Sequence, residues 1–206
     1  MYHKFGRAFA ASMALALAGV PTVAAAQGGM TYSDSYTFLK AVKERDGAKV
    51  NELLGSTTGT IVVNSRDRTN GEGALHYVVR ARDITYLTVL LGKGARPDLQ
   101  SNRGDTALTL AAQIGWLEGA EQLLARRASV DLANGRGETP LILATQRRDL
   151  AMVRLLLARR ADPKRTDNVA GMSALDYAKQ DPRAGAVLRL LEAKLAPAKP
   201  VAGPTK

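Results

Sequence analysis

Apolar residues return along this chain at intervals of 33 or 34 positions, and within each interval they follow helical spacing. A single leucine recurs early in each interval, at Leu75, Leu108, Leu141 and Leu175. A pair of leucines recurs late, at Leu90–Leu91, Leu123–Leu124, Leu156–Leu157 and Leu190–Leu191. Within one interval, Leu150, Val153 and Leu156 fall on one face of a helix with 3.6 residues per turn. We therefore expect two short helices per interval, the first beginning near the single leucine and the second ending at the pair.

The residue letters repeat at the same period. The segment GDTALTLAAQIGWLEGAEQLLARRASVDLAN at 104–134 returns as GETPLILATQRRDLAMVRLLLARRADP at 137–163. Further copies align at 71–98 and 171–195, and a degenerate copy lies at 35–55. Small residues also recur in one column of the first helices, at Val78, Ala111, Ala144 and Ala178. This pattern is typical of stacked repeat proteins, in which each unit buries one face on its neighbour.

The motif G-x-T-P-L-x-x-A at Gly137–Ala144, followed by a second helix with a double leucine, resembles the ankyrin repeat. The resemblance implies an all-α solenoid of stacked helix-turn-helix units joined by hairpin loops. It also implies a concave surface, formed by the loop tips and the exposed side of the first helices, that usually meets partners. Because such a solenoid has no obligatory active-site cleft, we expect its function to lie on a surface.

Several positions depart from the family pattern. Only Thr139-Pro140 keeps the Thr-Pro pair, and only His76 keeps the histidine of the signature. Glycine usually follows the second helix, where the backbone is left-handed; Gly94 fits, whereas Arg127 and Arg160 stand in the next two repeats. A residue with a side chain costs about 1 kcal/mol in that conformation, so we expect repeats of modest stability.

We predict eight segments along the chain. They are a signal peptide (1–26), a short linker (27–33), a degenerate N-terminal capping repeat with a long loop (34–70), three ankyrin repeats (71–100, 101–133 and 134–166), a C-terminal capping repeat (167–195) and a disordered tail (196–206). In the long loop, the apolar residues 61–63 are expected to form a short extended arm.

The first 26 residues predict export. Lys4 and Arg7 precede an apolar run from Ala8 to Val20, and Ala24-Ala25-Ala26 forms an A-x-A cleavage site. The run is short for a membrane span of about 20 residues, and no second hydrophobic segment follows, so no transmembrane span is expected after leader removal. We expect a periplasmic protein, with secretion beyond the cell or retention of the leader as an anchor as alternatives. The chain contains no cysteine, so stacking alone must hold the fold.

Basic residues outnumber acidic ones by 29 to 19, a formal net charge of +10. Cations at the ends of second helices, such as Arg126 and Arg159, have a structural explanation, because they complement the helix dipole. Others fall on the surface that the resemblance implies for partners. This candidate set is Arg66, Arg68, Arg80, Arg82, Asn102, Arg103, Gln113, Trp116, Arg136, Arg147 and Arg148.

The candidate set predicts a basic groove for an acidic protein partner on a monomeric solenoid. An anionic envelope ligand, either a polysaccharide or a lipid headgroup, is the alternative, and a solvated arginine face without a partner is the third interpretation. Export argues against nucleic acid as the natural target. For Trp116, packing between repeats is the favoured interpretation and an exposed anchor for a partner is the alternative.

The sequence lacks a convincing catalytic constellation. His76 is the sole histidine after leader removal and is expected to hydrogen-bond the adjoining loop backbone. Carboxylates recur at the repeat period and are interpreted as turn and capping residues: Asp98, Asp131, Asp162, Asp105 and Glu138. A hydrolase centred on His76, an acid–base pair of carboxylates or a weak calcium site would each require a convergence that the sequence does not show. We predict a protein that is not an enzyme and that needs no cofactor or metal.

Overall fold

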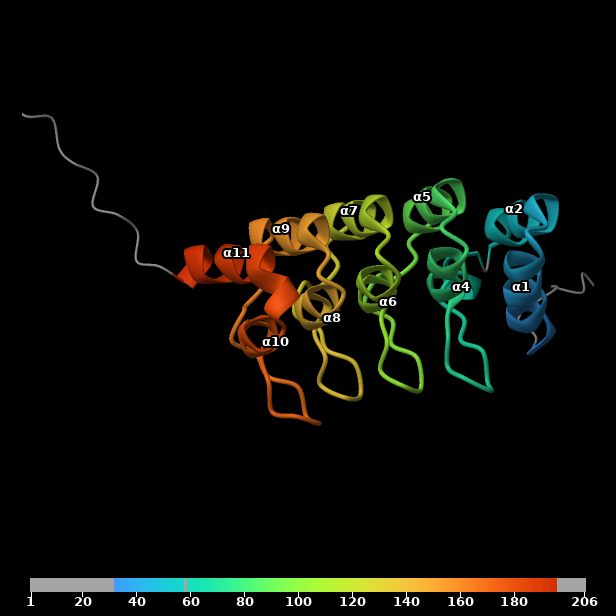
Figure 1. The fold of residues 1–206 in the computed structure, drawn as a ribbon. Coiled ribbons are helices and arrows are strands. Elements are labelled where there is room, and N and C mark those ends of the chain that lie inside the picture. The colour runs from blue at the N-terminus through green and yellow to red at the C-terminus, as the bar shows by residue number, and fades with distance from the viewer. Residues whose placement is uncertain (1–31, 58, 196–206) are drawn as a thin grey trace, which may run out of the picture.

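The computed structural model describes residues 32–57 and 59–195. Within them, eleven α-helices form an elongated stack of two layers, as Figure 1 shows. The first layer contains α1 (Tyr32–Glu44), α4 (Ala74–Arg80), α6 (Ala107–Ile114), α8 (Pro140–Gln146) and α10 (Ala174–Gln180). The second contains α2 (Gly47–Gly55), α5 (Ile84–Gly92), α7 (Leu117–Ala125), α9 (Leu150–Ala158) and α11 (Gly185–Leu195), with a 3-10 helix, η1 (Pro182–Ala184), before α11. The predicted all-α solenoid is confirmed.

The predicted leader and tail, and most of the linker at 27–33, lie outside the described residues. In the part of the chain that is described, no helix is both long and apolar enough to cross a membrane.

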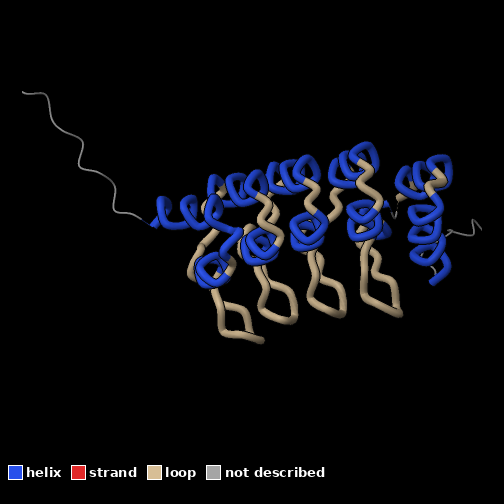
Figure 2. Tube along the Cα trace, viewed as in Figure 1, coloured by secondary structure: helices blue, strands red, loops and turns tan. Residues whose placement is uncertain are grey.

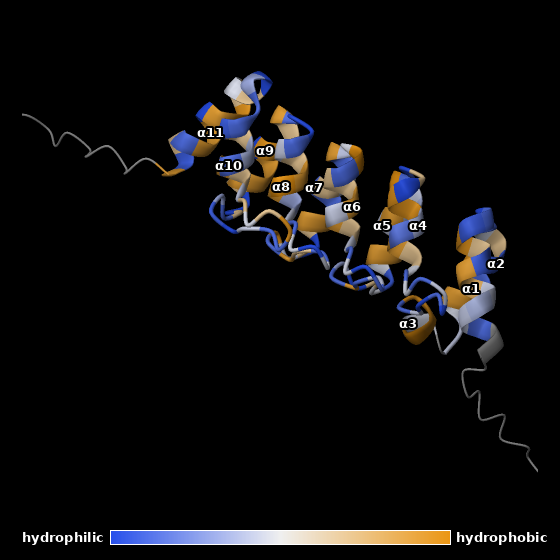
Figure 3. Cartoon of the chain, turned by 60° about the horizontal axis from the view of Figure 1, so that its bottom comes forward, coloured by the Kyte–Doolittle hydropathy of each residue, from blue (hydrophilic) through white to orange (hydrophobic). Residues whose placement is uncertain are grey.

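The two leucine columns form the core between repeats. Leu90, Leu123 and Leu156 are fully buried, and their following leucines are almost so. The small column of Val78, Ala111, Ala144 and Ala178 is buried where α4 packs on α6, α6 on α8 and α8 on α10. Only the last repeat differs, because Leu190 is half-buried while Leu191 is fully buried. In Figure 3 the loops are largely hydrophilic and the apolar residues gather on the helices.

Short polar residues begin the helices of each repeat. The Thr106, Thr139 and Ser173 hydroxyls accept bonds of 3.1, 3.2 and 3.3 Å from backbone N–H groups in the first turns of α6, α8 and α10. Asp83 and Asp149 accept equivalent bonds of 3.0 Å at the starts of α5 and α9. These caps satisfy N–H groups that a helix leaves unpaired, which explains why helices of seven to nine residues begin at defined positions.

The hairpin loops project to one side of the stack, below the first-layer helices in Figure 2. Consecutive loops are joined by backbone hydrogen bonds of 2.8 Å, from Asn102 N–H to the Asn70 carbonyl, from Gly135 N–H to Arg103 and from Asn168 N–H to Arg136. Gly104 lies beside this ladder with φ +77°, and a Cβ there would collide with the backbone N of Gly135. The tips are therefore held in register by main-chain contacts.

The predicted extended arm at 61–63 is wrong. Residues Gly59–Val62 form a short helix, α3, which contacts α1 and α2. Val62 and Val63 are buried in the core, and only Ile61 is exposed. A helical turn places these two neighbouring valines on the capping repeat, which an extended strand with alternating sides would not do.

The left-handed backbone expected after the second helices is present in all three repeats. Gly94 has φ +86°, and Arg127 and Arg160 have φ +64° and +68°. Three more arginines adopt the same conformation between first and second helices, namely Arg45, Arg82 and Arg148. The sequence implied backbone strain at two arginines, and the structure shows the left-handed conformation at five.

Candidate partner-binding surface

A polar groove of about 1180 Å³ runs along the hairpin loops. We call it the hairpin groove. Five members of the predicted set lie along its walls: Arg66, Asn102, Arg103, Gln113 and Arg136. Its lining also contains Arg96 and two carboxylates, Asp98 and Asp105. The structure thus brings together about half of the residues that the sequence proposed for a partner.

Three arginines of the predicted set are paired with carboxylates beneath them. Arg80 forms a bidentate ion pair with Glu72, in which Nη1 donates at 2.6 Å. The Nε atom of Arg103 lies 3.3 Å from Asp105, and Nη2 of Arg136 lies 2.7 Å from Glu138. The side chains of Glu72, Asp105 and Glu138 are only 5, 10 and 9% exposed, against 38, 74 and 63% for their arginines. The surface that carries these arginines is therefore less positive than a count of arginines implies.

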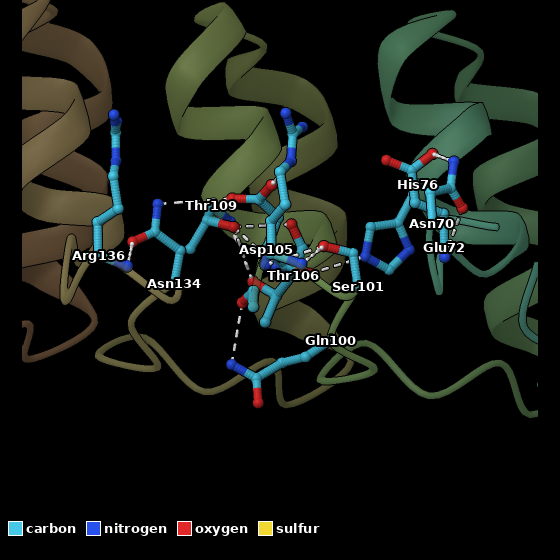
Figure 4. A network of polar contacts seen from close by, with 12 residues as sticks. Asn70, Glu72, His76, Gln100, Ser101, Asp105, Thr106, Thr109, Asn134 and Arg136 are labelled. Atoms are coloured by element: carbon cyan, nitrogen blue, oxygen red, sulfur yellow. Dashed lines mark hydrogen bonds and ion pairs between the residues drawn. The ribbon is translucent and has the colours of Figure 1, made fainter. Parts of the chain in front are cut away.

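Figure 4 labels one member of each pair, Glu72, Asp105 and Arg136, on three neighbouring repeats. Asn134 lies between two of them, since its Nδ2 donates to Glu138 at 2.9 Å and lies 3.5 Å from Asp105. Burial alone would raise the pKa of Glu72, but the hydrogen bonds and charge of Arg80 outweigh it and hold that pKa below its usual value. The same hydrogen bonds raise the pKa of Arg80, and those of Glu138 raise that of Arg136. The Arg80–Glu72 pair is consequently charged at neutral pH.

The other predicted arginines, Arg80 among them, lie outside the lining of the groove. Arg82 donates to the carbonyl of Ile114 in the next repeat, and Arg148 donates to Asp181 at 2.9 Å. Both therefore join one repeat to the next at the turns between helices. Arg68 and Arg147 are exposed, on the first hairpin and at the end of α8.

Trp116 is not a partner-binding residue on this surface, which corrects its place in the candidate set. It is only 6% exposed, at the position before α7, and its ring packs against Gly119 so closely that a Cβ on the glycine would overlap it. Burial of a large ring is strongly favourable, and the absence of a side chain at Gly119 provides the space for it. The burial favours packing over an exposed anchor, and the contact with Gly119 lies within its own repeat.

His76 has the structural role expected from its place in the signature. Its Nδ1 accepts from the Gly73 N–H at 3.1 Å, so Nε2 must carry the proton and donate to the Asp105 carbonyl at 2.8 Å. Burial lowers the pKa of His76, and the neutral ring links the first repeat to the second. Both ring nitrogens are occupied and the ring is fully buried, which leaves no atom of His76 for chemistry on a substrate.

The recurring carboxylates also have structural partners. Asp98 accepts from the backbone N–H of Ser129 at 2.8 Å, and Asp131 from that of Asp162 at 3.0 Å. They bond to the next repeat and not only within their own turn. Among the described residues, no group of three or more potential metal ligands converges.

A cluster that the sequence did not indicate joins the capping repeat to the first full repeat. Lys43 on α1 contacts Asp67 at 2.7 Å and lies over the ring of Tyr77, whose hydroxyl donates to Asp67 at 2.9 Å. The hydrogen bond from Lys43 is the largest of the contacts that lower the pKa of Asp67 far below its usual range. Asp167 and Tyr177 repeat the same bond at 2.6 Å in the last repeat. The shared spacing of ten residues between aspartate and tyrosine was the only available sequence signal.

Comparison with known proteins agrees with this architecture. A family model described as ankyrin repeats matches the chain in three overlapping copies, at residues 38–134, 75–167 and 115–198. Proteins built from these repeats generally act as protein–protein interaction scaffolds without catalytic activity. No curated protein matches the sequence.

Proposed function

Because the chain belongs to the ankyrin-repeat family, we propose that it is an exported, non-catalytic module that binds a protein partner in the hairpin groove. The observation that carries the proposal is the groove itself. It collects five of the residues predicted from sequence on loops whose spacing is fixed by backbone hydrogen bonds. Such a rigid surface loses little conformational entropy on binding, so contacts spread over several repeats can add up to useful affinity.

The proposed binding is tested by affinity capture from a periplasmic extract. The test variant carries Arg103→Glu and Arg136→Glu in the groove. Its matched control carries Arg154→Glu and Arg159→Glu, which make the same change of charge at exposed positions on α9 and at its C-cap. We expect a partner that both the unchanged protein and the α9 variant retain and the groove variant loses. Equal recovery of every partner by all three proteins would reject the groove as the binding surface.

Export is proposed from the predicted leader and has its own test. Residues 1–26 fused to an alkaline phosphatase that lacks its own signal should give activity, since that enzyme needs periplasmic disulfides. The mature protein should begin at Gln27 by N-terminal mass spectrometry. An inactive fusion, or a full-length chain recovered from the cytoplasm, would reject this part of the proposal.

The net charge of +10 favours a second candidate, an anionic envelope ligand such as a polysaccharide or lipid headgroup. Binding of this kind depends steeply on salt. We expect it to be weaker than capture of a protein, because carboxylates already balance three of the surface arginines. Titration of anionic vesicles and of a sulfated polysaccharide at low and high salt measures it, and an absence of binding at low salt would remove this candidate.

A further inference from the structure

Three consecutive repeats carry one buried carboxylate each at the same position of the repeat, and an exposed arginine lies over every one. Glu72, Asp105 and Glu138 are separated by 33 residues in each step. Their arginines come from different places, Arg80 from the end of α4 and the other two from the hairpin tips. An arginine from a helix end and arginines from hairpin tips thus form the same kind of ion pair. We take the pair itself, and not the hairpin sequence alone, as the feature that repeats.

In the Arg136–Glu138 pair the buried carboxylate fixes the direction of the guanidinium above it. In Arg136, Nε and Nη2 donate to Glu138 at 3.0 and 2.7 Å, so the edge formed by Nη1 is not used by that carboxylate. A guanidinium has five N–H donors in a rigid plane and can bind carboxylates along more than one edge. Because Glu138 already orders the side chain, a second carboxylate binds without the entropic cost of ordering it again.

The distance between repeats sets the spacing of any ligand that contacts all three pairs. First-layer helices that pack on one another lie about 8–10 Å apart, and the loops of the second and third repeats are joined directly by the bond from Gly135 N–H to the Arg103 carbonyl. A polyproline II chain rises about 3.1 Å per residue and has three residues per turn, so every third side chain returns to one face after about 9 Å. One acidic side chain in every three residues therefore matches one arginine per repeat.

The row of arginine–carboxylate pairs does not continue into the fourth repeat. Met172 takes the position of the carboxylate there, and the hairpin tip carries Ala170 and an exposed Val169 that is 75% accessible. A ligand longer than three acidic positions would thus meet an apolar tip at this end of the row.

Resting on the proposed function, we propose that the row of Arg80, Arg103 and Arg136 recognises an extended segment of a partner protein with an acidic residue at every third position. The pairing argues against a polyanion, because polyanions bind mainly to uncompensated positive charge, whereas each of these arginines already has a carboxylate. Guanidinium edges with a fixed direction and a regular spacing instead select individual carboxylates of a ligand.

The test uses two synthetic proline-rich peptides of identical composition. One carries three glutamates separated by two neutral residues, and the other carries the three glutamates in succession. Calorimetry on the full chain should show the spaced peptide binding about tenfold more tightly, since each additional charge-assisted hydrogen bond contributes on the order of one such factor. Equal affinities, or no binding of either peptide, would overturn the proposal.

Two variants separate fixed geometry from diffuse charge. The double variant Arg103→Lys and Arg136→Lys keeps the charge but removes the planar fork, and Arg154→Lys with Arg159→Lys is its control on α9. Glu138→Gln makes the surface more positive but releases Arg136. We expect the groove variants to weaken the spaced peptide by roughly tenfold and to leave the clustered peptide unchanged, with circular dichroism confirming the fold of each. Unchanged or tighter binding of the spaced peptide would overturn the proposal.

This outcome is distinguishable from failure of the proposed function. If neither peptide binds while a captured partner still depends on Arg103 and Arg136, the acidic spacing is wrong and the interaction surface stands. If no captured protein depends on these arginines, the proposed surface itself is wrong.

Discussion

Replacing Arg160 with glycine should stabilise the protein, although it removes a whole side chain. Arg160 has φ +68° directly after the C-cap of α9, where Gly94 has φ +86° in an earlier repeat. The backbone N–H groups of both residues donate to the carbonyl three positions before, at 3.1 and 3.2 Å, so the two turns are built alike. The Arg160 side chain is exposed, and no bond of it to another described residue exists that would be lost.

The magnitude follows from two opposing effects. A residue with a Cβ in the left-handed conformation costs roughly 1–2 kcal/mol. Glycine relieves this cost but makes the unfolded chain more flexible, which takes back about 0.4–1 kcal/mol. The expected net gain therefore lies within about 0–1.6 kcal/mol for Arg160→Gly, with a midpoint of about 0.8 kcal/mol, and is about twice that when it is combined with Arg127→Gly, whose site has φ +64°.

The matched control is the neighbouring residue. Arg159 is the C-cap of α9 with φ −90°, so Arg159→Gly relieves no strain and should destabilise by about 0.4–1 kcal/mol. Urea and thermal unfolding monitored by circular dichroism measure both variants, and 1 kcal/mol corresponds to a shift of about 2–4 °C for a chain of this length. If both variants lose stability alike, the left-handed arginines are not strained and this reasoning is wrong.

Three further predictions concern His76, Trp116 and Gly104. The pKa of His76 in the folded protein lies below its unfolded value of 6.5, so the unfolded chain binds the proton more readily. The unfolding free energy should therefore be constant above pH 6.5 and fall as the pH drops below it. Urea titration at pH 7 and pH 5 measures this dependence, and His76→Thr should remove it. Trp116→Ala should lower the unfolding free energy by about 3–5 kcal/mol while leaving capture of the partner by the remaining folded protein unchanged; a lost partner without lost stability would show an exposed role. Gly104→Ala should destabilise the protein strongly, because its Cβ would meet backbone atoms and its φ is +77°. Gly92→Ala, whose Cβ would have nothing within 4 Å, should be neutral or stabilising. Thermal unfolding compares the two variants, and the opposite order of stability would contradict the hairpin geometry.

The repeat architecture could be predicted from the sequence because its signal is periodic. The leucine columns and the small column at Ala111 and Ala144 depend on local spacing that returns in successive units. The role of His76 followed from its place in the family signature. The short helix α3 was missed because it occurs once, in the insertion, where no second copy reveals its pattern.

The candidate surface was predicted less completely. Positions such as Arg103 and Arg136 were identified because they fall on the loop tips. Their pairing with Asp105 and Glu138 was not, because a sequence gives no direction for a long side chain. Trp116 was left ambiguous for a related reason: whether a ring in a turn is buried depends on the space at Gly119, three residues later.

The three 2.8 Å hydrogen bonds that join consecutive loop tips use main-chain atoms, and this has a consequence for how such a protein can change. Substituting the side chains of Asn102, Arg103 or Arg136 alters what the tips display and leaves the backbone donors and acceptors in place, whereas a Cβ at Gly135 would lie 2.8 Å from the Arg103 carbonyl oxygen. New specificities can accordingly be selected one unit at a time, by mutation or in a library, while the glycines beside the tips must be left as they are.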